Sequence, residues 1–203
     1  MRYSESHKAE THQKILRIAS RALREKGPDN LAVAEVMKEA GLTHGGFYAH
    51  FKSKDALLAE ALTSVFLRAG DNIDKMTEGL PPRHALATYI DFYVSPRHRD
   101  NPSTGCPITA LNSDMPRQSK KFRDTFDRGV KVLVGRIAGW LAASGHADPD
   151  TLAASVLSAM AGAVAVSRAV SDKSLSDEML EAARAGIKAR LGVSDVDLSR
   201  RMN

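Results

Sequence analysis

The segment covering residues 31–54 constrains the fold of this chain more than any other stretch. Its apolar residues recur at helical spacing, namely Val33, Val36, Met37 and Ala40. Gly41 follows them, and glycine readily adopts the left-handed conformation that ends many helices. Thr43 is a residue type that commonly caps the start of the next helix. The segment therefore predicts two short helices joined by a tight turn.

The second of these helices, expected from Thr43 to about His50, has a surface suited to DNA. Phe47 and Phe51 are four residues apart, so both point back toward the first helix. The other side chains offer hydroxyl and imidazole groups for base edges, a phenol for a phosphate, and glycines that let the backbone approach a groove. The predicted DNA contacts are Thr43, His44, Gly45, Gly46, Tyr48, His50 and Lys54.

The string GLTHGGFYAHFKSKDALLAEAL closely resembles the end of the DNA-binding domain of TetR-type transcriptional repressors. The shared positions are Ala40-Gly41, Gly45, Tyr48, His50-Phe51 and the run Ser53-Lys54-Asp55-Ala56-Leu57-Leu58, at unbroken spacing. The resemblance covers about residues 11–62. It implies a homodimer that binds a near-palindromic, double-stranded operator and leaves it when a small molecule or an electrophile occupies the larger domain. In the family, the matching tyrosine, histidine and lysine contact the operator backbone.

The charge distribution is consistent with a nucleic-acid partner. The formal net charge is +5. Residues 1–54 contain ten Lys and Arg against six Asp and Glu, whereas the remainder contains nineteen against eighteen. Four of the seven histidines also lie in the first 54 residues. The positive excess thus coincides with the predicted DNA-binding segment, where phosphate is the natural partner.

Composition favours a cytoplasmic protein without a cofactor. A single cysteine excludes an intrachain disulfide framework and fits a reducing compartment. No secretory signal is found, and the uncharged stretch from Thr151 to Ser167 is short for a membrane span and rich in small residues. We interpret it as a buried helix and expect no membrane association. No phosphate loop, dinucleotide fingerprint, metal-spaced cluster or nucleophile elbow occurs, so no cofactor, metal or catalytic site is predicted.

Helical patterns fill the rest of the chain, so the predicted fold class is all-α. A helix-turn-helix domain is expected at residues 1–53 and a larger helical ligand-binding and dimerisation domain at 54–203. Ser53 is a plausible cap for a long helix from Lys54 toward Glu78. The stretch from Ser95 to Gly105 is expected to be an irregular loop. The predicted helices are residues 6–27, 33–40, 43–50, 54–78, 83–93, 106–114, 119–144, 151–171 and 175–191.

The helix predicted at 151–171 is apolar on nearly every side and carries small residues four apart. Small residues let another helix approach closely, so this helix and the last one are expected to pair with their twofold mates in a dimer. The candidate interface residues are Ser155, Ala159, Ala163, Ser167, Ala183 and Ile187. A helix lying wholly inside one subunit would have the same composition and stays an alternative.

An effector pocket is expected among aromatic residues of the larger domain. The candidates are Phe66, Tyr89, Phe92, Tyr93, Cys106, Trp140 and Met160, although such side chains commonly form plain core. Cys106 is either an inert buried thiol or a regulatory one activated by nearby cations. Two other classes of protein stay open: a sequence-tolerant architectural DNA-binding protein, and a thiol-dependent enzyme.

Overall fold

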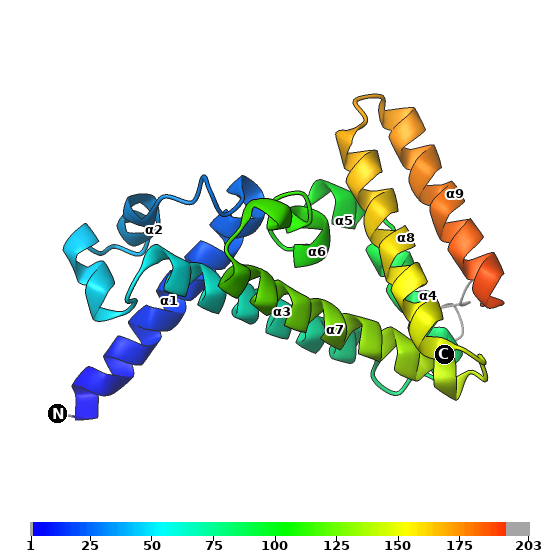
Figure 1. The fold of residues 1–203 in the computed structure, drawn as a ribbon, viewed down its shortest axis with the longest axis horizontal. Coiled ribbons are helices and arrows are strands. Elements are labelled where there is room, and N and C mark those ends of the chain that lie inside the picture. Colours follow the sequence, from blue (N-terminus) through cyan, green and yellow to red (C-terminus); the bar gives the residue numbers. More distant parts are fainter. Residues whose placement is uncertain (1, 194–203) are drawn as a thin grey trace, which may run out of the picture. The chain divides into compact units, whose positions relative to one another are not determined.

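The computed structural model describes residues 2–193, with side chains from residue 6 onward. These residues are helical and contain no strand, so the predicted all-α class is confirmed for them. The elements in chain order are α1 (Arg2–Lys26), α2 (Val33–Glu39), the 3-10 helix η1 (His44–Ala49), α3 (Lys54–Thr77), α4 (Pro82–Tyr93), α5 (Pro96–Asp100), α6 (Pro107–Leu111), the 3-10 turn η2 (Met115–Arg117), α7 (Lys120–Ala143), α8 (Pro149–Ala169) and α9 (Lys173–Leu191) (Figure 1).

The chain divides into two compact units. Unit 1 is Met1–Arg68 with Pro102–Gly129, and unit 2 is Ala69–Asn101 with Val130–Asn203. The chain passes between the units three times: within α3, between Asn101 and Pro102, and within α7. This division by contacts differs from the division into domains at 1–53 and 54–203 that the sequence suggested. The functional boundary between residues 53 and 54 stays a prediction.

Local signals in the sequence account for the main helix boundaries of unit 1. Gly41 has φ of 75°, and the amide of Leu42 donates to the carbonyl of Met37 at 2.9 Å, which closes the end of α2. At the start of α3, the hydroxyl of Ser53 accepts a hydrogen bond from the amide of Ala56 at 3.1 Å. The predicted stop and the predicted cap are therefore both present.

Two elements differ from the sequence prediction. The second helix of the pair is a 3-10 helix, because the two adjacent glycines at 45 and 46 lower the propensity for an α-helix. Thr43 occupies its N-cap position, but the side chain makes no capping hydrogen bond. The predicted loop at residues 95–105 contains the helix α5, which begins because the Ser95 hydroxyl accepts from the amide of His98 and Pro96 suits the first turn.

The core of unit 1 forms where α1, α2, η1 and α3 pack together. The helix α1 supplies Ile15, Ala19 and Leu23, each 0% exposed. The helix α3 supplies Leu57, Ala61, Leu62 and Val65, all likewise 0% exposed. Phe47 and Phe51 are buried, and their rings stack with centroids 5.7 Å apart. This core holds η1 against α2 and leaves its polar side chains outside.

Unit 2 is built around the antiparallel pair α8 and α9, which lie side by side (Figure 1). By length and composition, α8 is the one candidate membrane span among the described helices. It packs against α4, α5 and α9 but buries only one face. Of the predicted interface residues, Ser155 is exposed, Ala159, Ala163 and Ala183 are half-buried, and Ser167 and Ile187 are buried within the unit itself.

Buried polar side chains join the helices of unit 2. The guanidinium of Arg99, only 3% exposed, donates to Ser176 Oγ and to Asp177 Oδ1, both at 2.6 Å, and so attaches α5 to α9. The ammonium of Lys188 donates to both carboxylate oxygens of Asp91 at 3.0 Å and attaches α9 to α4. Each charge is paired, as burial requires.

The buried imidazole of His98 makes the stability of the protein pH-dependent. Burial lowers the pKa of His98, the hydrogen bond of Nδ1 with the carbonyl of Tyr93 opposes that shift, and Arg168 adds to it. Because the charged form is disfavoured in the folded state, the unfolded chain binds more protons near its own pKa of about 6.5. The free energy of unfolding is therefore expected to fall as the pH drops from 7.5 to 5.5.

Urea unfolding at both pH values checks this expectation. His98→Gln should lose less stability on acidification than the wild type, while the exposed His84→Gln serves as the control and should behave like the wild type. An equal loss in the wild type and in His98→Gln would show that other groups set the pH dependence.

Candidate nucleic-acid interface

The exposed side of η1 carries the predicted base and phosphate contacts. Thr43, His44, Gly45 and Tyr48 are exposed, whereas Gly46 and His50 are half-buried. Tyr48 is 70% exposed, and its ring packs edge-on against Phe47 with centroids 5.3 Å apart. The buried Phe47 therefore fixes the base of the tyrosine ring while the phenol reaches solvent, where it can donate to a phosphate oxygen.

Lys54 lies at the start of α3, and its ammonium donates to the carbonyl of Asp29 at 3.1 Å. This hydrogen bond orients the side chain and occupies one of the three donors of the ammonium group. Two donors and the positive charge are left for another acceptor. The arrangement suits a phosphate contact whose position is fixed by the loop after α1.

A hollow next to η1 brings in residues that the sequence prediction missed. Its volume is about 430 Å³, and it is lined by Lys8, Ala9, His12, Gln13, Ala49 and His50. The pKa of His50 is lowered by burial and then by the nearby His12 and Lys8. Its Nδ1 atom is buried and has no hydrogen-bond partner in the described part of the chain. The spacing of Lys8 and His12, one helical turn apart, is the sequence signal that could have found them.

Unit 1 also contains the lone cysteine in a cationic environment. Cys106 is half-buried at the start of α6, and its charged form interacts with the guanidinium of Arg24. Burial and the neighbouring Arg68 lower the pKa of Arg24 to about 10. The Nε of Arg24 is buried and has no partner among the described residues. Cations next to a thiol favour the thiolate.

The candidate effector residues fall into both units. Tyr89, Tyr93 and Trp140 are together in unit 2, with the ring centroid of Tyr89 5.7 Å from that of Tyr93 and 5.8 Å from that of Trp140. Met160, in the same unit, is fully buried. Phe92 is 40% exposed and stacks on His98. The remaining two candidates, Phe66 and Cys106, belong to unit 1.

The short helices α2 and η1, joined at Gly41 and presenting polar side chains on the second, define a helix-turn-helix DNA-binding protein. The model of bacterial regulatory proteins of the tetR family matches residues 15–61. A second model, the C-terminal domain of LmrA/YxaF-like transcriptional regulators, matches residues 82–184. The chain belongs to the TetR family of transcription regulators. Members of this family are regulators and not enzymes.

Individual relatives agree with this assignment. The uncharacterized transcriptional regulator YdgC of Bacillus subtilis is 32% identical over 174 residues, which cover 73% of this chain and 89% of YdgC. Two further regulators of that organism match over only 29% and 47% of their own length, so the chain spans less than half of each.

Two solved structures share the fold. The reduced form of NemR of E. coli superimposes with a TM-score of 0.78 at 19% identity, covering 92% of this chain and all of NemR. A regulator from Saccharomonospora viridis in complex with choline gives 0.73 at 21% identity, covering 89% of this chain and 96% of that protein. At these identities the two structures establish the common fold.

Proposed function

We propose that this chain is a homodimeric transcriptional repressor that binds a near-palindromic operator through η1 and leaves it when an effector binds or modifies the protein. The observation that carries the proposal is the group of exposed polar side chains on one short helix, Thr43, His44 and Tyr48, held by a buried aromatic base. A protein with a chromosomal operator as its partner acts in the cytoplasm.

The contacts divide into two kinds. Tyr48, His50 and Lys54 are assigned to backbone phosphates, because a phenol, an imidazole and an ammonium donate to phosphate oxygens without reading sequence. His44 and Thr43 are assigned to base edges in the major groove, with Gly45 and Gly46 allowing close approach. In the dimer, the two η1 helices are expected to enter successive major grooves about 34 Å apart.

Binding to an operator, recovered by selection from random duplexes with the purified protein, tests this assignment. Tyr48→Phe and Lys54→Ala should weaken binding to operator and random DNA alike. His44→Ala should reduce the difference in binding free energy between operator and random DNA by ~1–3 kcal/mol, which is the discrimination that one base contact provides. The measurement is a titration of each duplex at fixed salt, because phosphate contacts make affinity salt-dependent. If His44→Ala leaves the difference unchanged while Tyr48→Phe alters it, the assignment is wrong.

Dimerisation is proposed through the outer faces of α8 and α9. The exposed residues of α8 recur every three or four positions and therefore share a face: Ser155, Ser158, Gly162, Val166 and Ala169. The exposed small residues of α9 are Ala182, Ala185, Gly186 and Ala189. These faces are small and mostly apolar, which suits close packing against a second copy in a four-helix interface. Of the residues predicted from sequence, Ala159, Ala163 and Ala183 border this surface.

Release is proposed to start in unit 2, where Tyr89, Tyr93 and Trp140 form an aromatic cluster, or at Cys106 in unit 1. The helix α3 begins with Lys54 in unit 1 and ends at Thr77 in unit 2, so a displacement of its far end can reach the DNA-binding segment. The solved regulator from Saccharomonospora viridis, which shares this fold, is in complex with the small molecule choline.

Cys106 is the proposed target of an electrophilic effector. Its place beside Arg24 favours the reactive thiolate, and adding bulk there would disturb the packing of α6 against α1. Treatment with a benzoquinone, followed by operator titration, is expected to weaken DNA binding by about 5- to 150-fold, the range of ordinary allosteric coupling. Cys106→Ser should be insensitive to the reagent. If mass spectrometry finds the cysteine modified while operator affinity is unchanged, the thiol has no regulatory role.

A further inference from the structure

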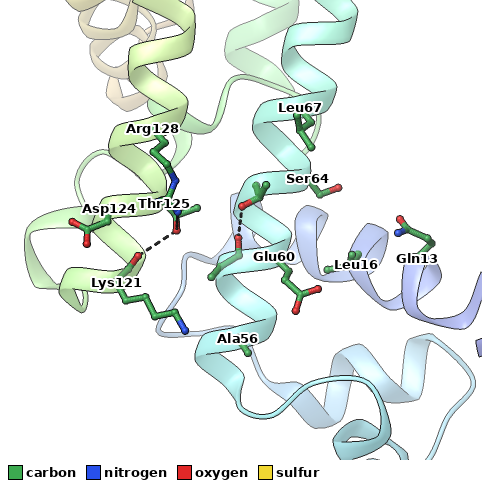
Figure 2. Close-up of a pocket in the computed structure, with 12 residues that line it drawn as sticks. Gln13, Leu16, Ala56, Glu60, Ser64, Leu67, Lys121, Asp124, Thr125 and Arg128 are labelled. Carbon is green, nitrogen blue, oxygen red and sulfur yellow. Dashed lines mark hydrogen bonds between the residues drawn. The ribbon is translucent and has the colours of Figure 1, made fainter. Parts of the chain in front are cut away.

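Unit 1 contains a second hollow, a groove with a volume of about 650 Å³ that shares Gln13 with the hollow next to η1. Figure 2 shows its position: α3 runs through the middle, α1 borders it with Gln13 and Leu16, and the start of α7 borders it with Lys121, Asp124, Thr125 and Arg128. The volume lies within the range of small-molecule sites, about 300–1,000 Å³. All three helices contribute from within unit 1, so the groove is complete in this unit.

The groove combines an apolar surface with hydrogen-bonding groups. The apolar part consists of Leu16, Ala56, Ala59 and Leu67. Leu67 is 65% exposed and so is accessible to a ligand. Ser64 and Gln13 also line the groove, and neither side chain has a hydrogen-bond partner within the described residues. A ligand with an apolar body and a polar group would match both parts of the groove.

The charges that line the groove are unevenly paired. Glu60 lies 3.0 Å from His12 Nε2, and Asp124 lies 2.9 Å from the ammonium of Lys120. The two cations of the lining, Lys121 and Arg128, have no carboxylate within 4 Å among the described residues. Arg128 donates instead to the hydroxyl of Thr125 at 2.9 Å. The pKa of Asp124 is lowered mainly by the hydrogen bond from Lys120, and the positive charge of Arg128 adds a smaller contribution.

Both cations of the lining come from α7. Lys121 and Arg128 are seven residues apart, or two helical turns, and therefore lie on one face of α7. Figure 2 shows their side chains on the α7 side, opposite Gln13 and Leu16. A negatively charged group placed there gains charge-assisted hydrogen bonds that no protein carboxylate supplies.

We propose that this groove is a second ligand site, which binds a small organic anion with its charged group at Lys121 and Arg128 and its apolar body on Ala59 and Leu67. It is separate from the effector sites proposed at Cys106 and in the aromatic cluster of unit 2. The lining helices α1 and α3 flank the DNA-binding segment in the chain, so a bound ligand would contact the same unit that is proposed to bind DNA.

The probe for this site is naphthalene-2-sulfonate, whose sulfonate is charged at all working pH values, and its neutral partner is 2-acetylnaphthalene. Amide chemical shifts of the full-length protein are followed by ¹⁵N transverse-relaxation-optimised NMR during each titration. Saturable shifts are expected at Ser64 and Thr125 with the sulfonate. The neutral compound should bind about tenfold more weakly, the effect of losing one charge-assisted hydrogen bond.

Variants separate the proposed contacts from general attraction to a basic protein. Lys121→Gln with Arg128→Gln should weaken sulfonate binding by about tenfold or more. Lys131→Gln removes an exposed lysine from the same helix outside the groove and should leave the affinity unchanged. Lys121→Gln alone, at an exposed position, should weaken binding about threefold and provides the test if the double variant does not fold.

Two results would overturn the proposal. One is the absence of saturable shifts at the groove amides up to the solubility limit of the probe. The other is equal affinity for the charged and neutral compounds together with no effect of the lysine and arginine substitutions. Both results can be obtained without DNA, so they are independent of the proposed repressor function.

Discussion

Replacing Val166 with glutamate is expected to turn the proposed dimer into a monomer and to weaken operator binding by about 10²- to 10⁴-fold, the gain that two linked half-sites normally provide. Val166 is 49% exposed on the outer face of α8, among small residues that allow a second helix to approach closely. A carboxylate in such a contact would lose its hydration without gaining a partner. Light scattering and operator titration measure the two effects.

A matched substitution distinguishes this interface from a general effect of added charge. Val132→Glu places the same carboxylate on an exposed valine of α7, where Val132 is 58% exposed. This variant should stay dimeric and keep its affinity for the operator. A Val166→Glu protein that still scatters light as a dimer would contradict the proposed use of α8, and a monomeric Val132→Glu protein would move the interface to α7.

The sequence was sufficient for most helix boundaries of unit 1, because those boundaries depend on near neighbours. Gly41 ends α2 by its own positive φ, and Ser53 caps α3 through a hydrogen bond three residues away. The buried residues of α1, Ile15, Ala19 and Leu23, are four residues apart and so share one face of the helix, a pattern that is visible in the sequence. The helix α5 lies in a segment that was expected to be an irregular loop, whereas Ser95 and Pro96 together start a helix there.

Features that depend on several distant helices could not be predicted in this way. The small residues of α8 at 155, 159, 163 and 167 were expected to form one interface row. Within the unit, however, α9 covers Ser167: the hydroxyl of Ser176 donates to the Ser167 carbonyl at 2.6 Å. A stripe of small residues does not indicate which partner covers it. The exposed row lies one position earlier in the sequence and includes Ser158, Gly162 and Val166.

The two hollows of unit 1 illustrate the same limit for candidate sites. The DNA-contact residues of η1 lie within a single motif, and the motif could be recognised. Lys8 and His12 join His50 only because α1 folds back beside η1. In the larger groove, Gln13, Ser64 and Arg128 come from three helices separated by more than a hundred residues of sequence from first to last. No spacing rule connects such positions, and only the packing of the helices brings them together.

Gly129→Ala is expected to destabilise the protein by about 1–3 kcal/mol, the usual cost of adding volume to a packed core. Gly129 is buried on α7, and a Cβ atom built there would overlap the ring of Phe66 at its attachment point. That ring is itself held edge-on against Phe126, with centroids 5.8 Å apart. The added methyl group must therefore push α7 away from α3 or turn Phe66 out of its position.

The same helix provides a control for the intrinsic effect of the substitution. Gly135 also lies within α7, but a Cβ atom there would meet nothing within 4 Å, so Gly135→Ala should stabilise the protein by ~0.5–1 kcal/mol through helix propensity alone. Urea unfolding of both variants gives the comparison. In a Phe66→Leu protein, the loss of stability caused by Gly129→Ala should be smaller by about 0.5 kcal/mol or more, because the aromatic ring that the new methyl group would overlap is gone. Equal costs on the two backgrounds would mean that Phe66 is not the obstacle and that Gly129 is required for another reason.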